Sequence, residues 1–278
     1  MINNIPKRHF YNNKEYFLDF EKKILVLDPQ FHEKLLNKKL WNKFGFKKIG
    51  GSFVGEVLAV DKYKSQFQAF CKISWCSLPI LDKKYVNAGI KIEPKVINAL
   101  KETLKVDITQ FPPEKYNFDY FEDKDEIIGG IPDGYINEQK IIIEIKTTGE
   151  KNYEQWKQFG IPAGYLKQAQ IYAYLMGVEK FWIVATFLKE EDYLNPDNFP
   201  IKQRKLKNYP FILNKPQVLD DINTIKEWYK KYTKLGYSPT WDEEKDSDLI
   251  EYLKCENEQQ YLDLLEKWKI EGKFIDEP

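Results

Sequence analysis

One segment, residues 131–148 with the sequence IPDGYINEQKIIIEIKTT, constrains the fold more than any other part of the chain. Four isoleucines within 141–145 predict a buried strand, and the polar residues 137–139 predict a turn before it. A strand in 127–136 would then pair with one in 140–147 as a hairpin. Together with the helical segments around it, this pattern predicts a central mixed sheet flanked by helices, in an α/β or α+β fold.

Charged residues interrupt this apolar strand. Glu144 and Lys146 are two positions apart and share one face, while Ile143 and Ile145 share the other. The hairpin would bring Asp133 beside Glu144, and two close carboxylates repel each other unless a cation lies between them. Mg²⁺ is usually bound by one or two carboxylates together with water and phosphate oxygens. A lysine beside such an ion could position or deprotonate an attacking water.

Hydrophobic periodicity and capping residues predict the elements on either side of the hairpin. Those before it are a strand pair in 8–27 around Asn12-Asn13, helices at 29–43 and 64–72 (capped by Ser65), a helix capped by Ser52, and a helix within 87–104 that has Pro94 in its first turn. Those after it are a helix at 162–177, a buried strand at 181–188, a basic loop or strand edge at 202–207, and helices at 217–236 and 247–270.

Charge and composition narrow the classes of partner. Lys+Arg and Asp+Glu are equal at 43 each, but residues 1–110 hold 20 basic against 11 acidic residues, a net charge of +9. This excess can indicate a nucleic-acid surface. The alternative is that the protein has two solvated faces of opposite charge. Only Arg8 and Arg204 are arginines, which favours backbone contact over base readout. Three cysteines without metal-ligand spacing indicate a reduced, cytoplasmic protein, and no apolar run is long enough to span a membrane.

The spacing D–x10–E–x–K, here Pro132-Asp133 and then Glu144-Ile145-Lys146, resembles the PD-(D/E)xK nuclease motif. The segment YLKQAQIYAYLMG resembles the Q-x-x-x-Y helix of the lambda-exonuclease-like branch, with Gln168 and Tyr172 at the matching positions. Further similarities lie in AGIKIEPKVINAL, which places Glu93, in KKIGGSFVGEVLAVDKYKSQFQAFCKI and in the tail YSPTWDEEKDSDLIEYL. The opening segment resembles the YqaJ-like viral recombinase family, and the resemblance covers about residues 45–250.

The resemblance implies a role for each matching residue. Asp133 and Glu144 would bind a metal directly, with the carbonyl of Ile145 as a third ligand and Glu93 contributing from its helix, directly or through water. Lys146 would orient the attacking water, Gln168 would tie its helix to Lys146 or to the scissile phosphate, and Tyr172 would support that helix at the DNA. A 5′-phosphate would be held by Ser52, and Lys47 or Lys48 would replace an arginine that the family has and this chain lacks.

The resemblance also implies an activity: a Mg²⁺-dependent deoxyribonuclease, with Mn²⁺ able to substitute, acting as an exonuclease on linear double-stranded DNA in recombination or repair. Its expected partners are DNA ends, further copies of itself in a trimeric ring, and a single-strand-annealing recombinase. The expected domains are an N-terminal extension at 1–44, the nuclease domain at 45–250 and a helical tail at 251–278. The alternatives are a site-specific endonuclease and a non-catalytic DNA-binding protein of the same fold.

Several residues have a second interpretation. Glu144 and Lys146 could form an ordinary cross-strand pair on an exposed hairpin. Gln170 with Tyr174 repeats the spacing of Gln168 with Tyr172. Glu93 could be an acidic residue that complements a helix dipole near its N-terminus, and Ser52 could be a simple N-cap.

Overall fold

The structure, a computed structural model, describes residues 2, 4–37 and 45–276. The chain forms two compact units, each assembled from segments far apart in sequence: residues 1–49, 56–83 and 225–278 form the first, and residues 50–55 and 84–224 the second. This division crosses the predicted domain ranges. Both predicted terminal ranges fall in the first unit, and the predicted nuclease range contributes to both units.

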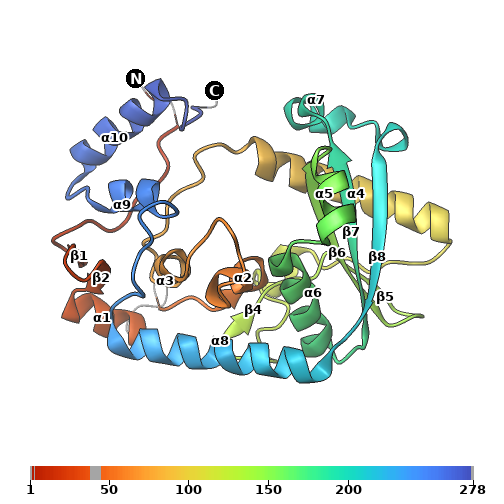
Figure 1. Cartoon of the computed structure of the whole chain (residues 1–278), viewed down its shortest axis with the longest axis horizontal. Helices are drawn as coiled ribbons and strands as arrows, with labels where there is room; N and C mark the ends of the chain where they lie inside the picture. Colours follow the sequence, from red (N-terminus) through yellow and green to blue (C-terminus); the bar gives the residue numbers. More distant parts are fainter. Residues whose placement is uncertain (1, 3, 38–44, 277–278) are drawn as a thin grey trace. The chain divides into compact units, whose positions relative to one another are not determined.

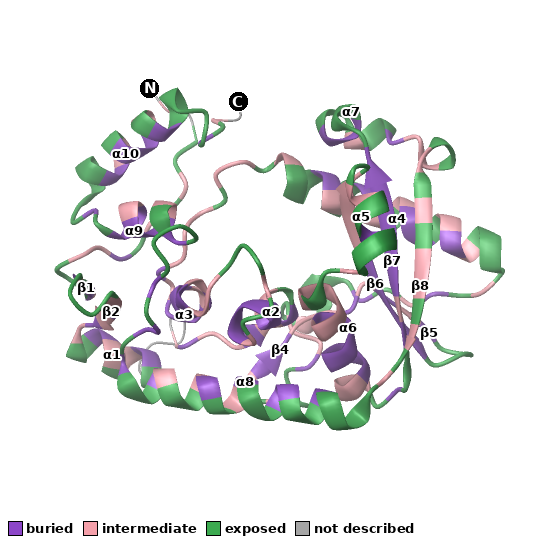
Figure 2. Cartoon of the chain, in the orientation of Figure 1, coloured by how far each residue is buried: buried purple, intermediate pink, exposed green. Residues whose placement is uncertain are grey.

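The second unit is built on a four-stranded sheet with the order β5-β6-β7-β8 (Figure 1). The strands are β5 (Gly134–Ile136), β6 (Ile141–Gly149), β7 (Lys180–Leu188) and β8 (Lys205–Ile212). β5 and β6 are antiparallel, β6 and β7 parallel, and β7 and β8 antiparallel. The predicted mixed sheet is therefore confirmed, and its two central strands are the long apolar ones, as their burial in Figure 2 shows.

Alternation along β6 supplies both faces of the sheet with core residues. Ile143 and Ile145 pack in one cluster with Ile92 and Val96 of helix α4 (Lys84–Leu104). Ile142 packs in the opposite cluster with residues of helix α6 (Ala163–Met176). The sheet is thus covered on both sides, which explains why β6 and β7 can be almost continuously apolar.

Short elements complete the second unit. They are β4 (Ile128–Gly129), α5 (Asn152–Phe159), α7 (Glu190–Leu194) and 3₁₀ turns at 51–53, 113–116, 196–198 and 201–203. Helix α8 (Lys215–Leu235) begins here and continues into the first unit, and β3 (Ile49–Gly50) lies where the chain passes between units.

The first unit contains the antiparallel strands β1 (Tyr16–Asp19) and β2 (Ile24–Leu27) and mostly short helices. The helices are α1 (Pro29–Leu36), α3 (Gln66–Ile73), α9 (Ser247–Leu253) and α10 (Glu258–Ile270), while α2 (Val54–Val57) starts in the second unit and ends in the first. Ser65 caps α3 as predicted, by accepting a hydrogen bond from the amide of Gln68. Among the described residues, no helix combines the length and apolar character needed to cross a bilayer.

Several predicted boundaries were wrong. The first hairpin turns between Asp19 and Ile24, because Asn12 and Asn13 precede the paired residues. The first helix ends at Leu36, and residues 38–43 of its predicted range lie outside the described residues. The predicted helix 247–270 is two helices, since Asn257 caps a new start at Glu258.

Two further corrections concern predicted site residues. Ser52 is not an N-cap: the cap position of its 3₁₀ turn is Gly50, no side chain caps that turn, and Ser52 is exposed. Helix α4 begins at Lys84, so Pro94 lies in its interior and not in its first turn. Glu93 is therefore about two turns from the N-terminus of α4, too far to complement the helix dipole.

Candidate active site

The hairpin of β5 and β6 brings Asp133 to the strand that carries Glu144 and Lys146. Gly134 is paired with Ile143, so the antiparallel register places Asp133, just before β5, next to Glu144. The Oδ2 atom of Asp133 accepts a hydrogen bond of 2.6 Å from the amide of Ile145. This bond fixes the carboxylate at the edge of β6, where its other oxygen can face a ligand.

Lys146 lies at the centre of the polar contacts on that strand. Its Nζ atom is 3.2 Å from Oε2 of Glu144 and 2.9 Å from Oε1 of Gln168 on α6. The ring of Tyr165 lies 5.1 Å from the same ammonium, at a distance suited to a cation–π contact. Glu144 is fully buried and the Lys146 side chain is 15% exposed, so this is no cross-strand pair on a solvated hairpin.

The two glutamines of α6 differ in their contacts. Gln168 accepts from Lys146, whereas Gln170 is buried with its amide nitrogen lacking a partner. Helix periodicity explains the difference, since residues two apart point about 200° away from each other. Only Gln168 lies on the side of α6 that faces Lys146.

Glu93 joins the site from α4. It is close enough that its charge interacts with those of Asp133 and Lys146. Burial is the largest influence on its pKa and Asp133 the second, and together they raise that pKa to about 7. Glu93 is too far from the N-terminus of α4 to complement the helix dipole, and its charge interacts with those of Asp133 and Lys146.

Burial shifts the other ionisable groups as well, because a charge in the interior loses its hydration. It raises the pKa of Glu144 well above its usual range, with the Asp133 charge adding to the effect, and it raises the pKa of Asp133 against the opposing charge of Lys146. For Lys146, burial lowers the pKa, but the charges of Glu144 and Asp133 outweigh it and the net shift is upward. Lys146 is therefore protonated at neutral pH and acts as a hydrogen-bond donor.

One observation indicates that the carboxylates of Asp133 and Glu144 suit a divalent cation. The Oε1 atom of Glu144 is buried and has no hydrogen-bond partner. A buried carboxylate oxygen is costly to leave unsatisfied, and a cation between Glu144 and Asp133 would satisfy it and relieve their repulsion. Within the described residues, no three His, Cys, Asp or Glu side chains already surround one point, so water and substrate would complete the coordination of Mg²⁺.

Tyr172 lies one turn after Gln168 on α6 and is only 3% exposed. Its hydroxyl interacts with the Gln168 side chain and the Ile131 backbone. Gly51 and Gly130 leave room for it, because a Cβ atom at either position would overlap the hydroxyl oxygen. This burial agrees with the predicted role of Tyr172 in supporting its helix. It disagrees with a direct contact between Tyr172 and DNA.

The predicted phosphate-binding residues are distributed over both units. Ser52 belongs to the second unit, while Lys47 and Lys48 belong to the first. The Lys47 ammonium lies 3.8 Å from the Trp75 ring, and burial lowers its pKa. The predicted 5′-phosphate pocket thus stays a prediction, as does the carbonyl of Ile145 as a metal ligand.

Sequence reasoning missed two features of the site. The first is the pair of supporting glycines, Gly51 and Gly130. Their one signal in the sequence is that each belongs to a Gly-Gly pair. A cavity beside Glu93 and Asp133, lined in part by Phe111 and Pro112, had no signal in the sequence because its walls come from three separate segments.

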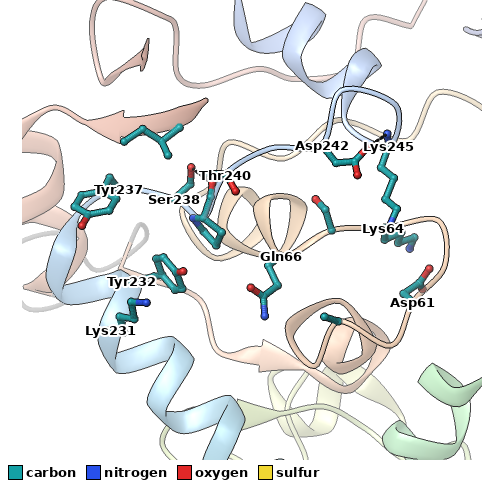
Figure 3. A pocket seen from close by; sticks show the side chains of 14 residues that line it. Asp61, Lys64, Gln66, Lys231, Tyr232, Tyr237, Ser238, Thr240, Asp242 and Lys245 are labelled. Atoms are coloured by element: carbon teal, nitrogen blue, oxygen red, sulfur yellow. Dashed lines mark hydrogen bonds between the residues drawn. The ribbon is translucent and has the colours of Figure 1, made fainter. Parts of the chain in front are cut away.

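A second concavity, of 450 Å³, lies within the first unit (Figure 3). Its lining includes Lys64, Lys231, Lys245, Asp61 and Asp242, so positive and negative charges are mixed. The ammonium of Lys64 is 3.2 Å from the buried carboxylate of Glu56. Among the described residues, the lining contains no buried polar side-chain atom without a hydrogen-bond partner. We assign no chemistry to it.

Comparison with known proteins shows a family and a fold that this chain resembles. Residues 40–179 match the YqaJ-like viral recombinase domain. The uncharacterized protein MG373 of Mycoplasma genitalium is 28% identical, and its homolog in Mycoplasma pneumoniae is 23% identical; each alignment covers 81% of this chain and 93% of the relative. An alkaline exonuclease (LHK-Exo) from Laribacter hongkongensis superposes with a TM-score of 0.50 at 14% identity, over 66% of this chain and 87% of that chain.

The structural likeness shows the fold, which is the predicted PD-(D/E)xK core, and the matched residues 40–179 include Glu93, Asp133, Glu144, Lys146 and Gln168. The match spans half of the chain and takes in each segment that contributes to the site. The chain belongs to the YqaJ-like viral recombinase family.

Proposed function

We propose that this protein is a metal-dependent deoxyribonuclease that degrades linear double-stranded DNA from an end. One observation carries the proposal: Lys146 is held between Glu144 and Gln168, while Glu144 keeps a buried oxygen without a partner beside Asp133. Burying two carboxylates and an ammonium together costs desolvation free energy, and binding DNA without catalysis does not require that cost. A phosphodiesterase uses all three.

The roles of the chain's own side chains follow from their contacts. Asp133 and Glu144 would hold the cation, and Glu93 would hold it directly or through water. When bound, Mg²⁺ would supply Lewis acidity and a water of lowered pKa. Lys146 donates protons in hydrogen bonds to the attacking water and to the phosphate oxygens that gain charge, and Gln168 fixes the direction of its ammonium.

Attack on the phosphorus by a water that Lys146 positions would break one phosphorus–oxygen ester bond and leave a phosphate on one product and a hydroxyl on the other. A proton passes from the attacking water to solvent, and a proton from solvent reaches the departing oxygen. The reaction needs no oxidant, reductant or co-reactant other than water.

The state of the two arginines favours an exonuclease over a site-specific endonuclease. Arg8 bonds to three backbone carbonyls and the Tyr16 hydroxyl, and Arg204 bonds to Asp192 and Glu191. Neither guanidinium is available for the bidentate contact to guanine that site-specific proteins use most often. A trimeric ring around DNA and a recombinase partner are parts of the proposal that rest on the family resemblance.

The test compares linear and closed circular plasmid DNA, with Mg²⁺ or with EDTA. We expect loss of the linear form only, and only with the metal. Cutting of closed circles would instead indicate an endonuclease. Absence of cleavage of any DNA with either Mg²⁺ or Mn²⁺ would refute the enzyme.

Replacement of Lys146 tests the catalytic assignment. Lys146→Ala should lower kcat by at least about a hundredfold, since a positioned donor to developing charge is lost, while DNA binding changes little. Lys157→Ala is the matched control, because Lys157 is an exposed lysine of α5 in the same unit. A Lys146→Ala protein with the kcat of this control would contradict the role.

A further inference from the structure

Two glycines, Gly129 and Gly130, lie shortly before Asp133 in the chain and are in close contact with two side chains. A Cβ atom at Gly130 would overlap the hydroxyl of Tyr172. A Cβ atom at Gly129 would lie 2.7 Å from Oδ2 of Asp119, closer than such atoms normally approach. The tyrosine and the carboxylate can therefore lie against the backbone only because both residues lack side chains.

The carboxylate of Asp119 also bonds to this backbone. Its Oδ1 atom accepts a hydrogen bond of 2.9 Å from the amide of Gly130 and one of 3.0 Å from the amide of Phe121. The amide of Tyr120 in turn donates to the carbonyl of Gly130 at 2.9 Å. Both backbone polar groups of Gly130 are thus bonded to one neighbouring segment, which restrains its position and its orientation.

An unusual turn brings Asp119 to this place. Asn117 and Phe118 have φ of +47° and +64°, in a region that residues other than glycine seldom occupy. The Phe118 side chain is 70% exposed, so the turn does not serve to bury it. Strain of this kind persists where the surrounding structure maintains it, and it is frequent at functional sites. Here the turn allows Asp119 to reach Gly130.

The link from the glycines to the candidate active site is stiff. It consists of Ile131 and Pro132, which directly precede Asp133. The proline ring fixes its own φ and restricts the residue before it to extended conformations. A shift of Gly130 is therefore passed on to Asp133 and is not absorbed between them. On its other side, the Asp133 carboxylate is bonded to the amide of Ile145 at 2.6 Å.

We propose that Asp119 is a positioning residue for the metal site. Its carboxylate holds Gly130, and through the stiff link 131–132 it holds Asp133 at the distance from Glu144 that suits a shared cation. The inference rests on the proposed function, because the position of Asp133 affects catalysis only if Asp133 binds the metal.

Calorimetric titration with Mn²⁺ tests the role without depending on activity. Asp119→Ala removes the acceptor of both amide bonds and should weaken Mn²⁺ binding about tenfold, as expected when a group that orients a metal ligand is lost. Asp119→Asn keeps an oxygen that can accept the same bonds and should retain nearly the wild-type affinity. An equal loss in Asp119→Asn would mean that the negative charge acts directly on the cation, and it would overturn the positioning role.

Asp125 provides a matched control in the same loop. It accepts two hydrogen bonds of 2.9 Å, from the amides of Ile127 and Ile128, so these bonds stop short of the glycine pair. Asp125→Ala removes the same charge and the same number of amide bonds. It should lose a similar amount of stability in urea unfolding and keep the wild-type Mn²⁺ affinity.

The titrations are made at a temperature at which circular dichroism shows each variant to be folded. If Asp119→Ala does not fold, Asp119→Glu replaces it, because that variant keeps the charge but moves the acceptor by one methylene. It should also bind Mn²⁺ more weakly than Asp125→Ala does.

The outcomes separate this role from the proposed function. Wild-type Mn²⁺ affinity in Asp119→Ala, or equal losses of affinity in Asp119→Ala and Asp125→Ala, would overturn the role of Asp119 and leave the nuclease intact. Absence of both Mn²⁺ binding and DNA cleavage in the wild-type protein would refute the nuclease, and the role of Asp119 with it.

Discussion

At the scale of single residues, the site combines groups that are unfavourable when isolated. Glu144 is fully buried, carries an unpartnered oxygen and lies next to a second carboxylate. Among the residues that the structure describes, Lys146 is the one cation that offsets that charge in the protein without metal. The same arrangement that would bind a cation therefore destabilises the protein when the cation is absent.

Replacing Glu144 should reveal this cost. The pKa of Glu144 is higher in the folded protein than in the unfolded chain, so the folded state binds more protons between the two values. The free energy of unfolding then falls as pH rises from about 4.5 upward, and Glu93, with a pKa of about 7, adds to the fall up to neutral pH. In EDTA at pH 8, Glu144→Gln should be more stable than wild type by roughly 1–3 kcal/mol.

Thermal unfolding with and without Mn²⁺ checks that expectation. Wild type should gain stability from Mn²⁺ and Glu144→Gln should not, because a ligand that binds only the folded state raises its stability. The difference between the two proteins in EDTA should shrink as the pH is lowered toward 5. A Glu144→Gln protein less stable than wild type at pH 8 would show that Glu144 is a stabilising partner of Lys146.

The two glutamines of α6 give a second test at this scale. Gln168→Ala removes the acceptor that directs the Lys146 ammonium, and residues that orient a catalytic group typically contribute about 10–100-fold. We therefore expect a fall in kcat of that size with little change in Mn²⁺ affinity. Gln170→Ala, two residues away and without a contact to Lys146, should keep the wild-type kcat; equal losses in the two variants would contradict the assignment.

At the scale of elements, the site depends on how α6 packs against the segment that leads into β5. The Tyr172 hydroxyl occupies a space that exists because Gly51 and Gly130 lack side chains. Gly130 also has φ of +139°, a conformation that L side chains rarely adopt. One tyrosine on a helix thus sets the position of the backbone that carries Asp133.

A double-mutant cycle can measure this packing. Gly130→Ala should cost about 2–4 kcal/mol, through both the clash with Tyr172 and the strained φ. In the Tyr172→Phe background the cost should be smaller by about 1 kcal/mol or more, because the oxygen that meets the new Cβ is gone. Urea unfolding of the four proteins gives the coupling energy, and additive costs would mean that Tyr172 does not occupy the space as described.

At the scale of the whole molecule, distant segments of the chain are joined within each unit. In the first unit, Arg8 of the N-terminal segment donates to the carbonyls of Tyr252 and Cys255 and lies 4.0 Å from the Tyr252 ring. It also lies 5.4 Å from the ring of Tyr261 on α10. A single guanidinium therefore connects the two ends of the sequence, which the predicted division at 44 and 251 would have separated.

Arg8→Lys should show how far that connection stabilises the first unit. A lysine keeps the charge but cannot bond to several acceptors in one plane, nor stack as a guanidinium does. We expect a loss of about 1–3 kcal/mol in the free energy of unfolding. Lys7→Ala, a neighbouring exposed lysine, is the control, and equal stability of the two variants would remove Arg8 from this role.

The sequence by itself determined the hairpin of β5 and β6, the buried strand β7 and the residues that carry the charges of the site. The last strand of the sheet, β8, was predicted only as a basic loop or strand edge at 202–207. Alternation in 141–147 specifies which side chains share a face, because the period of a strand is two. Helix α6 follows from its apolar spacing, and its end at Met176 follows from the glycine after it, Gly177. Strand alternation also put Glu144 and Lys146 on one face, where the structure has them, whereas Gln168 was assigned from the family resemblance.

The tertiary structure alone decided what depends on several segments at once. Local signals could not show that Pro94 lies inside a long helix, that Gly50 and not Ser52 occupies the cap position, or that both termini belong to one unit. The space around Tyr172 and the cavity beside Asp133 are likewise shared among segments. Their geometry depends on the packing of side chains that are far apart in the sequence. Short-range periodicity reports only on neighbouring residues, so it cannot predict that packing.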